Sequence, residues 1–455
     1  MFPRFVYESY SHEFCSDGLH LSFRFLLGDK IVFEPTASIP SRPFYTRTLS
    51  KEQLDVLTFN IGMIELISYW KAACPPTVEV RCGHLSSQQI DFWKKIYFNG
   101  LGEFYYVNNI KDSYEQFMTI ESAATEPFEA APIETLAPMG DSYLVPIGGG
   151  KDSVVTLERL RRQHLNVRPL IMNPRGATTN CATQAGFPIE EVAVIHRTIH
   201  PRLLELNKNG CLNGHTPFSA MLAFYTLLVS AMTGIPNIAL SNESSANEST
   251  VAGTNVNHQY SKSLEFENDF REYYTQFIAP HFAVGSFNYF SYLRPLSELQ
   301  IAMLFAQQKE YHPIFRSCNK GSKTDIWCCH CPKCLFAYII LSPFIAPNDL
   351  KTIFGADLLD DASLQTEFLQ LIGEEETKPF ECVGTVSEVN SALSMCINRW
   401  YQHQPLPAML KNYRPLPPTT PLDTLYTEHN VDSHLVEQLQ QQIVEAAFKI
   451  KQTTR

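Results

Sequence analysis

Residues 144–157 read LVPIGGGKDSVVTL. A short apolar run ends in three glycines, and Lys-Asp-Ser then opens a second apolar run with helical spacing. This pattern predicts a buried strand, a tight turn and a helix that begins near Lys151. Further along the chain, NVRPLIMNP, EEVAVIHRTI and NIALSNE have the pattern of strands, and an apolar helix is predicted at 217–233. Strands that alternate with helices indicate an α/β fold, in which a parallel sheet has helices on both faces.

Two further regions flank this α/β unit. Residues 1–138 combine strand-hairpin and helix patterns and end in a proline-containing stretch at 121–138 that is typical of a linker. We therefore expect an α+β N-terminal domain, followed by a central domain over 139–350. Residues 351–455 are predicted to form a helical C-terminal region, which ends in an amphipathic helix at 434–452.

The composition limits the classes of partner. The 455 residues carry a formal net charge of −11, which argues against tRNA or DNA binding, because basic surface supplies most of that affinity.

Residues 218–236 are uncharged and long enough to cross a membrane. Because Gly234 and Pro236 end this run and a strand pattern follows, we expect a buried helix and no membrane insertion. No signal-peptide pattern is seen at the N-terminus, so a cytoplasmic location is expected.

The glycine turn has the composition of a phosphate-binding loop. The pattern G-x-x-x-x-G-K-[ST] does not fit, because Val145 stands at its first glycine and Asp152 at its Ser or Thr. The pattern G-x-G-x-x-G does not fit either, because Ser153 replaces its last glycine. GGGKDS, at 148–153, is similar to S-G-G-x-D-S, the pyrophosphate loop of the PP-loop ATP pyrophosphatases, with Gly148 in place of the first serine.

Each residue type in this loop has a physical reason. Glycines let backbone N–H groups converge on phosphate oxygens, and the positive end of the following helix points at the same anion. Lys151 adds positive charge, Asp152 can hold Mg²⁺, and the Ser153 hydroxyl can donate a further hydrogen bond. The nucleotide-binding residues expected from this pattern are Gly148, Gly149, Gly150, Lys151, Asp152 and Ser153.

A cysteine cluster follows in SCNKGSKTDIWCCHCPKC, residues 317–334. Thiolates at short spacings in a chain without a secretory pattern suit a closed tetrahedral zinc site. Cys329 and His330 are then spare, although either can replace a member of the set, and an iron–sulfur cluster has similar spacing. The expected metal ligands are Cys318, Cys328, Cys331 and Cys334.

Carboxylates follow another predicted strand. SNESSANE, at 241–248, supplies Glu243 and Glu248, and the carboxyl ends of parallel strands share one edge of a sheet with the glycine turn. Either glutamate can bind Mg²⁺ or act on a substrate, and the alternative is a polar loop with a helix cap. VNHQYSKSLEFENDF adds His258 and Lys262, and Lys262 can face a substrate carboxylate. The alternative there is a solvated loop followed by an amphipathic helix.

These motifs together define a family resemblance. The four cysteines resemble those of the 7-cyano-7-deazaguanine synthases, which are shorter and lack a region like 1–138. The long N-terminal extension, VPIGGGKDS, SNESSANE and CPKC resemble, over nearly the whole chain, the bacterial UDP-N-acetylmuramoyl-L-alanyl-L-glutamate epimerases. This resemblance implies a reaction of peptidoglycan synthesis. ATP, with Mg²⁺, adenylates the α-carboxylate of the terminal L-glutamate, AMP and diphosphate leave, and D-glutamate results.

The resemblance leaves the proton-abstracting base open. Lys151 and Asp152 are expected to act at the phosphates, and a UDP-N-acetylmuramoyl-L-alanine–L-glutamate ligase is the expected functional partner. Other open assignments are a related carboxylate-adenylating ligase, a tRNA thiolase and a nucleotide sensor without turnover. The candidate bases are Glu243, Glu248, His215, His258 and Lys262; for a lone histidine such as His196, His200 or His215, a structural hydrogen bond is the commoner role.

Overall fold

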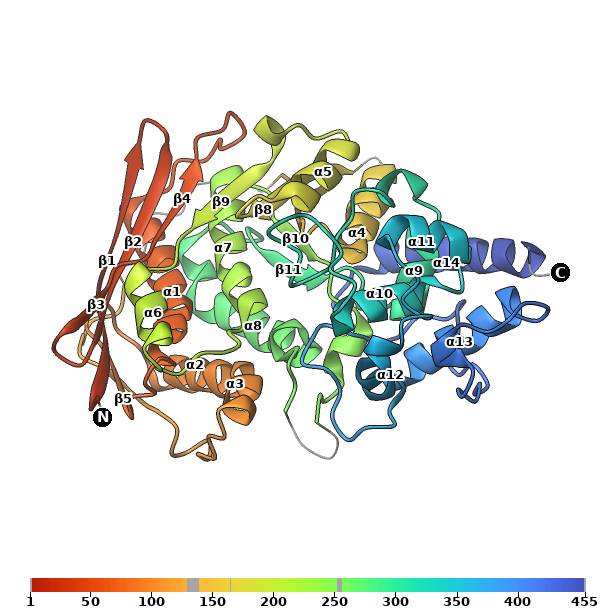
Figure 1. Cartoon of the computed structure of the whole chain (residues 1–455). Coiled ribbons are helices and arrows are strands. Elements are labelled where there is room, and N and C mark those ends of the chain that lie inside the picture. Colours follow the sequence, from red (N-terminus) through yellow and green to blue (C-terminus); the bar gives the residue numbers. More distant parts are fainter. Residues whose placement is uncertain (1, 129–138, 164, 252–255, 454–455) are drawn as a thin grey trace.

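The computed structural model describes residues 2–128, 139–163, 165–251 and 256–453 (Figure 1). Within these residues, eleven strands form one sheet in the order β11-β10-β7-β8-β9-β4-β2-β1-β5-β6, and β3 pairs with β2. The first five strands of this order are parallel neighbours. They are β7 (Ser142–Pro146), β8 (Asn166–Met172), β9 (Ala193–Arg197), β10 (Asn237–Leu240) and β11 (Asn288–Ser291).

The N-terminal strands continue the same sheet. β4 pairs antiparallel with β9, with Ser38 opposite His196, so the sheet is continuous across the boundary predicted at residue 138. The hairpin of β2 and β3 is as expected, with Gly28 at φ +61° in the turn. These strands are β1 (Arg4–Cys15), β2 (Gly18–Leu27), β3 (Ile31–Phe33), β4 (Thr36–Pro40), β5 (Thr77–Val80) and β6 (Thr119–Ser122).

The predicted linker at 121–138 is partly wrong. Glu121 and Ser122 belong to β6, which pairs parallel with β5, because backbone donors and acceptors are available there beside a sheet edge. Residues 129–138 of that stretch lie outside the described residues. The three-part domain division stays a prediction.

The described residues contain fourteen α-helices. After β11 the described chain adds helices and no further strand, which agrees with the predicted helical character of 351–455. The helices are α1 (Lys51–Trp70), α2 (Ser87–Gly100), α3 (Gly102–Val107), α4 (Lys151–Arg162), α5 (Gly176–Gln184), α6 (Pro201–Lys208), α7 (Phe218–Thr233), α8 (Leu264–Phe277), α9 (Glu298–Phe305), α10 (Pro332–Leu341), α11 (Pro347–Phe354), α12 (Gln365–Ile372), α13 (Val386–Trp400) and α14 (Ser433–Thr453).

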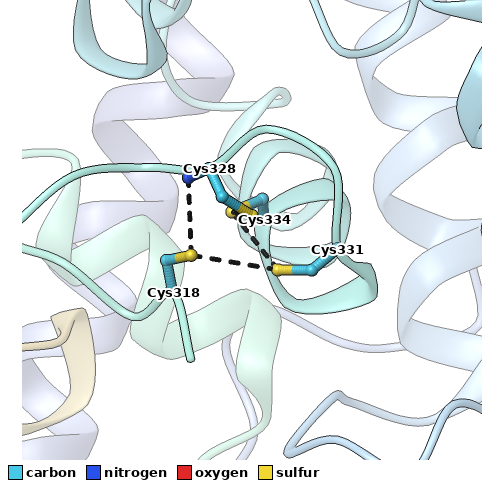
Figure 2. Close-up of side chains that lie close together, drawn as sticks. All are labelled: Cys318, Cys328, Cys331 and Cys334. Atoms are coloured by element: carbon cyan, nitrogen blue, oxygen red, sulfur yellow. Dashed lines mark hydrogen bonds between the residues drawn. The ribbon is translucent and has the colours of Figure 1, made fainter. Parts of the chain in front are cut away.

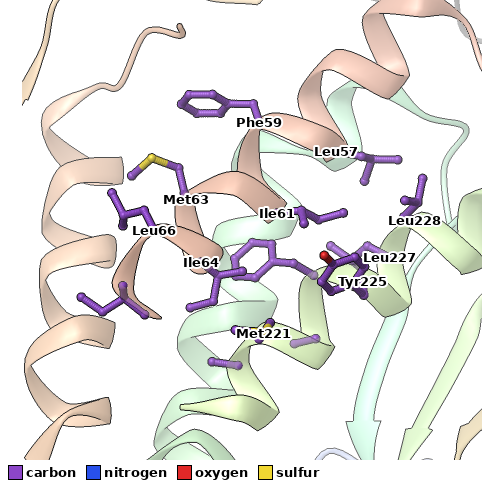
Figure 3. Close-up of a cluster of buried hydrophobic side chains, with 14 of the residues drawn as sticks. Leu57, Phe59, Ile61, Met63, Ile64, Leu66, Met221, Tyr225, Leu227 and Leu228 are labelled. Carbon is purple, nitrogen blue, oxygen red and sulfur yellow. The ribbon is translucent and has the colours of Figure 1, made fainter. Parts of the chain in front are cut away.

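The parallel strands are buried on both faces. Along β7, Leu144 packs into a core with α1 and α7, whereas Tyr143 and Val145 face a second core with α4, α9 and α10. This alternation follows from the two-residue period of a strand. Figure 3 shows the first core, where side chains of α1 and α7 meet. The apolar helix α7 is thus a core helix, and no helix among the described residues is long and apolar enough to cross a membrane.

The order of the parallel strands decides where loops meet. β10 lies between β7 and β11, and all three run in the same direction. The segments that follow them therefore emerge at one edge of the sheet. These segments are the glycine turn after β7, residues 241–248 after β10, and residues 292–298 after β11.

Candidate active site

The glycine turn after β7 is built for close backbone approach. Gly149 has φ +80°, and a Cβ there would lie 2.9 Å from Cβ of Ala177 and from the backbone nitrogen of Thr178 in α5. Gly150 is the N-cap of α4, and no side chain caps this helix. The first N–H groups of α4 and its positive dipole end therefore face the turn, as an anion site requires.

Lys151 does not project into solvent as a free cation. Its side chain is only 3% exposed and forms ion pairs with Asp152 and with Glu298, the first residue of α9. Burial alone would lower the pKa of Lys151, but the two carboxylates raise it above its ordinary value. Burial raises the pKa of Glu298 to about 8, and Lys151 opposes that rise. Lys151, Asp152 and Glu298 therefore connect the N-terminus of α4 to the N-terminus of α9 at the sheet edge.

Arg294, which lies between β11 and α9, fixes two of the loops. It is 1% exposed, and its guanidinium donates to the carbonyl oxygen of Glu243 at 2.5 Å and to that of Lys262. The Glu243 side chain is buried and accepts from the Ser245 hydroxyl at 3.3 Å. Burial disfavours the charge of Lys262, but Cys382 and Glu243 together raise its pKa. Lys262 thereby lies where both Glu243 and Asp152 act on its charge.

Cys382, in the segment before α13, contacts the group formed by Lys151, Asp152, Glu243 and Lys262 through Lys262. Lys262 Nζ lies 3.2 Å from the sulfur of Cys382, and the His258 side chain acts electrostatically on the same sulfur. On its other side, His258 Nδ1 lies 2.5 Å from a carboxylate oxygen of Glu103 in α3. His215 Nδ1 approaches the same carboxylate at 3.4 Å. Residues from all three predicted regions therefore meet here.

The pKa values of Cys382, His258 and His215 are shifted from their ordinary values in different directions. Burial would raise the pKa of Cys382, but Lys262 and His258 lower it to about 6. Burial opposes the charge of His258, yet Cys382 and Glu103 raise its pKa to about 9. Burial lowers the pKa of His215 to about 4, so this ring is neutral at pH 7. Strongly displaced titrations of this kind are typical of functional sites.

The segment that carries Cys382 is held on both sides. Gln259 donates to the carbonyl oxygen of Val383 at 3.1 Å. At the start of α13, Glu388 accepts from Thr385 in a capping box, and its other oxygen accepts from the N–H of Glu298 at 2.8 Å. The N-terminus of α9, which carries Glu298 toward Lys151, is thus fixed by the C-terminal region.

The four predicted metal ligands also come together (Figure 2). Their sulfur atoms lie 3.5–4.0 Å apart in the pairs Cys331–Cys334, Cys328–Cys334 and Cys318–Cys331. A tetrahedron with metal–sulfur bonds of about 2.3 Å has edges of about 3.8 Å, so the four sulfurs fit zinc. The N–H of Gly321 donates to the Cys318 sulfur at 3.0 Å, which favours a thiolate.

The loop that carries Cys318 is hydrogen-bonded to the glycine turn. The N–H of Arg316 donates to the carbonyl oxygen of Gly149 at 2.8 Å, two residues before Cys318. Cys329 points elsewhere, with its sulfur 3.2 Å from the carbonyl oxygen of Phe354, and His330 is exposed. The spare pair is thus separate from the four-sulfur group.

Comparison with known proteins gives the family. Residues 1–292 match the family model described as MurL N-terminal domain, and residues 314–420 match the MurL C-terminal domain. The chain belongs to the MurL family. A relative in Xanthomonas oryzae pv. oryzae, named UDP-N-acetyl-alpha-D-muramoyl-L-alanyl-L-glutamate epimerase, is 31% identical over 92% of this chain and 93% of its own length. Relatives with the same name in Salinispora tropica and a Micromonospora species are each 34% identical, over 74% and 72% of this chain, respectively, and 72% of their own lengths.

In this MurL-family chain, most of the predicted site residues lie at one sheet edge. Lys151, Asp152, Glu243 and Lys262 are connected through ion pairs and electrostatic contacts. Glu248 is not in that group, because its carboxylate pairs with Lys378. The Ser153 hydroxyl donates to the carbonyl oxygen of Gly150 at 3.0 Å, inside the turn itself.

Several residues of this candidate site were not expected from the sequence. Glu298 had a signal, because the strand-like NYFS precedes it and Ser297 with Gln300 forms a capping box. Cys382 had no such signal, since it stands alone in a loop of the region predicted to be helical. The missed residues are Glu103, Arg294, Glu298, Cys382 and Glu388.

Proposed function

We propose that this chain is an ATP-dependent epimerase, which converts the terminal L-glutamate of UDP-N-acetylmuramoyl-L-alanyl-L-glutamate to D-glutamate. The relatives carry the name of that epimerase, and the one in Xanthomonas oryzae pv. oryzae matches 92% of the chain. The observation that supports ATP use is the uncapped N-terminus of α4 after a glycine turn, beside buried lysines and carboxylates. In this proposal the turn is a PP-loop for pyrophosphate.

Activation makes the proton transfer feasible. The α-proton beside a carboxylate anion is very weakly acidic, because its removal builds a dianion. An acyl adenylate removes one negative charge and leaves a carbonyl that accepts the electron pair of the broken C–H bond. Hydrolysis of the adenylate then releases AMP and makes the inversion irreversible.

The site residues have distinct roles in this scheme. The N–H groups at the start of α4 would bind phosphate oxygens, and the open space around Gly148, where a Cβ would meet no atom within 4 Å, leaves room for them. Asp152, whose pKa stays lowered by Lys151 and Lys333 against the effect of burial, remains ionised. Asp152 and Glu243 are the carboxylates that would hold Mg²⁺, which neutralises charge on the leaving diphosphate.

The four-cysteine group has a structural role in the same proposal. Cys318, Cys328, Cys331 and Cys334 would hold zinc in a closed site, with no position left for substrate. The bond from Arg316 to Gly149 connects that loop to the phosphate turn, so the metal would set the position of the turn. The substrate would come from a ligase that adds L-glutamate to UDP-N-acetylmuramoyl-L-alanine.

The test uses the purified full chain with ATP, Mg²⁺ and UDP-N-acetylmuramoyl-L-alanyl-L-glutamate, without ammonia. Chiral chromatography of hydrolysed product should show D-glutamate, and AMP and diphosphate should appear in equal amounts. Omission of ATP should abolish inversion. Recovery of L-glutamate alone would overturn the epimerase assignment, and inversion without ATP would overturn the activation step.

A further inference from the structure

We propose that Cys382 is a catalytic residue of this site, whose thiolate removes the α-proton of the terminal glutamate. The inference rests on the proposed epimerisation and names the base that the sequence left open. Cys382 lies in the described segment between α12 and α13, far in sequence from the glycine turn, and is only partly exposed.

The contacts of Cys382 are those of an anion. Its sulfur accepts from the Lys262 ammonium at 3.2 Å, and His258, whose ring Glu103 holds, acts on the same sulfur electrostatically. A hydrogen-bonded ammonium and a second nearby cation favour the thiolate, which is the basic and nucleophilic form. By contrast, burial raises the pKa of Cys74, Cys82, Cys181 and Cys396, which therefore remain thiols.

The thiolate lies beside the proposed nucleotide site. Lys262 and Lys333 act electrostatically on both Cys382 and Asp152, so the sulfur and the first turn of α4 share the same two neighbouring cations. Arg294 fixes the Lys262 backbone to the Glu243 loop, which keeps this spacing. In a glutamyl adenylate the α-carbon is bonded to the acyl carbon, so a phosphate bound at the turn would bring the α-carbon into the region that Lys262 and Lys333 share with Cys382.

Two of the earlier candidates cannot accept a proton at neutral pH. Lys262 is charged, since Cys382 and Glu243 raise its pKa against the effect of burial. His258 is charged as well, because Cys382 and Glu103 raise its pKa to about 9 despite burial. Glu248 is paired with Lys378, outside the cluster. Lys262 and His258, as cations, stabilise the thiolate of Cys382 instead.

The proposed inversion uses one proton transfer on each face of the α-carbon. The Cα–H bond breaks, its proton goes to the sulfur, and its electron pair moves onto the acyl carbonyl to give an enolate. A water molecule on the opposite face donates a proton to Cα, and the hydroxide that results takes the proton from the thiol. The thiolate is restored, and the configuration at Cα is inverted. In D₂O the product must therefore carry deuterium at Cα.

The experiment compares two partial reactions in D₂O for the full chain. Deuterium at the glutamate α-carbon is measured by mass spectrometry, and diphosphate release is measured in parallel. Cys382→Ala and Cys382→Ser should slow deuterium entry about 100-fold more than they slow diphosphate release. Cys211→Ala is the matched control, because Cys211 is a partly buried cysteine packed against the core of α1 and α7, and it should change neither rate.

A chemical measurement keeps the test independent of folding. Iodoacetamide at about pH 6.5 should modify Cys382 in the wild-type chain, as mapped on peptides, and should stop deuterium entry in proportion. Deuterium entry that persists after Cys382 is alkylated, or that stays within about 3-fold of wild type in Cys382→Ala, would overturn the proposal. Absence of diphosphate release from the wild type would count against activation, and Cys382-dependent deuterium entry would still support the base.

Discussion

Lys151 and Glu298 form a buried ion pair between the first residues of α4 and α9, and the side chains are 3% and 2% exposed. The two helices follow β7 and β11, which lie on either side of β10. The pair therefore connects the ends of strands that are separated by almost 150 residues in sequence. It also places a positive charge at the start of a helix, where the macrodipole alone would disfavour it.

Removing this lysine should be costly. Lys151→Met leaves Glu298 and Asp152 without their cation, and because the pKa of Glu298 is already raised to about 8 by burial, this carboxyl takes up a proton and the cost is about 1–3 kcal/mol. The free energy of unfolding, measured by urea titration, should fall by that amount. The double variant Lys151→Met/Glu298→Gln should lose less than the sum of the single changes. Lys411→Met, at an exposed position, is the control and should stay near wild type. Additive losses would contradict the coupling.

Glycine at position 149 is required by backbone geometry. Gly149→Ala places a Cβ 2.9 Å from Ala177 and forces alanine to adopt φ +80°. The expected loss of stability is at least about 1 kcal/mol, with weaker ATP binding by calorimetry. Gly148→Ser is the matched neighbour, because a Cβ there meets nothing within 4 Å. That variant should stay within about 0.5 kcal/mol of wild type. Equal losses in both variants would refute this account of the turn.

The glycine turn could be predicted from the sequence, whereas the partners of its lysine could not. The strand, the glycines and the start of α4 are local in sequence, so residues 144–157 predicted them well. The partners of Lys151 and Lys262 are not local. Glu298 and Cys382 reach the site only because β11 lies beside β10 and because α13 is capped onto α9. No periodicity within a short window records such a contact, and for that reason the base was left open.

Metal content distinguishes the four sulfurs from the spare pair. Elemental analysis should find about one zinc per wild-type chain and no iron. Cys334→Ser should lose the metal and destabilise the turn through Arg316, whereas Cys329→Ser should keep it, since that sulfur faces Phe354. Bound iron together with visible absorbance would show that the four cysteines hold an iron–sulfur cluster and not zinc. Zinc loss in Cys329→Ser would change the ligand set.

The ion cluster at Cys382 predicts a pH dependence of stability. The folded-state pKa of Cys382 is about 6, where Lys262 and His258 lower it against burial, below the ordinary value of 9.0. Its contribution is therefore complete above about pH 9 and is lost as the pH falls through about 6. The unfolding free energy of wild type minus that of Cys382→Ser should accordingly grow between about pH 5 and pH 8. A difference that is flat across this range would show that the sulfur carries no charge.

His258 titrates in the opposite sense. Its folded-state pKa of about 9, raised by Cys382 and Glu103 although burial opposes its charge, lies above the ordinary 6.5. Its contribution is complete below about pH 6.5 and is lost as the pH rises through about 9. His258→Gln should therefore cost most stability at acidic pH, in urea titrations at several pH values. Unchanged cost up to about pH 10 would contradict the pairing.

The antiparallel pairing of β4 with β9 decides how the molecule can be divided. Arg197 of β9 forms two bonds of 2.6 Å with Glu65 of α1, and Tyr225 of α7 donates to the same carboxylate. The N-terminal region and the central region therefore share backbone pairing and a buried ion pair, and behave as one unit. A fragment that starts at residue 139 would expose the edge of β9 and leave Arg197 without its counter-ion. Active protein is thus expected only when both regions are expressed in one chain.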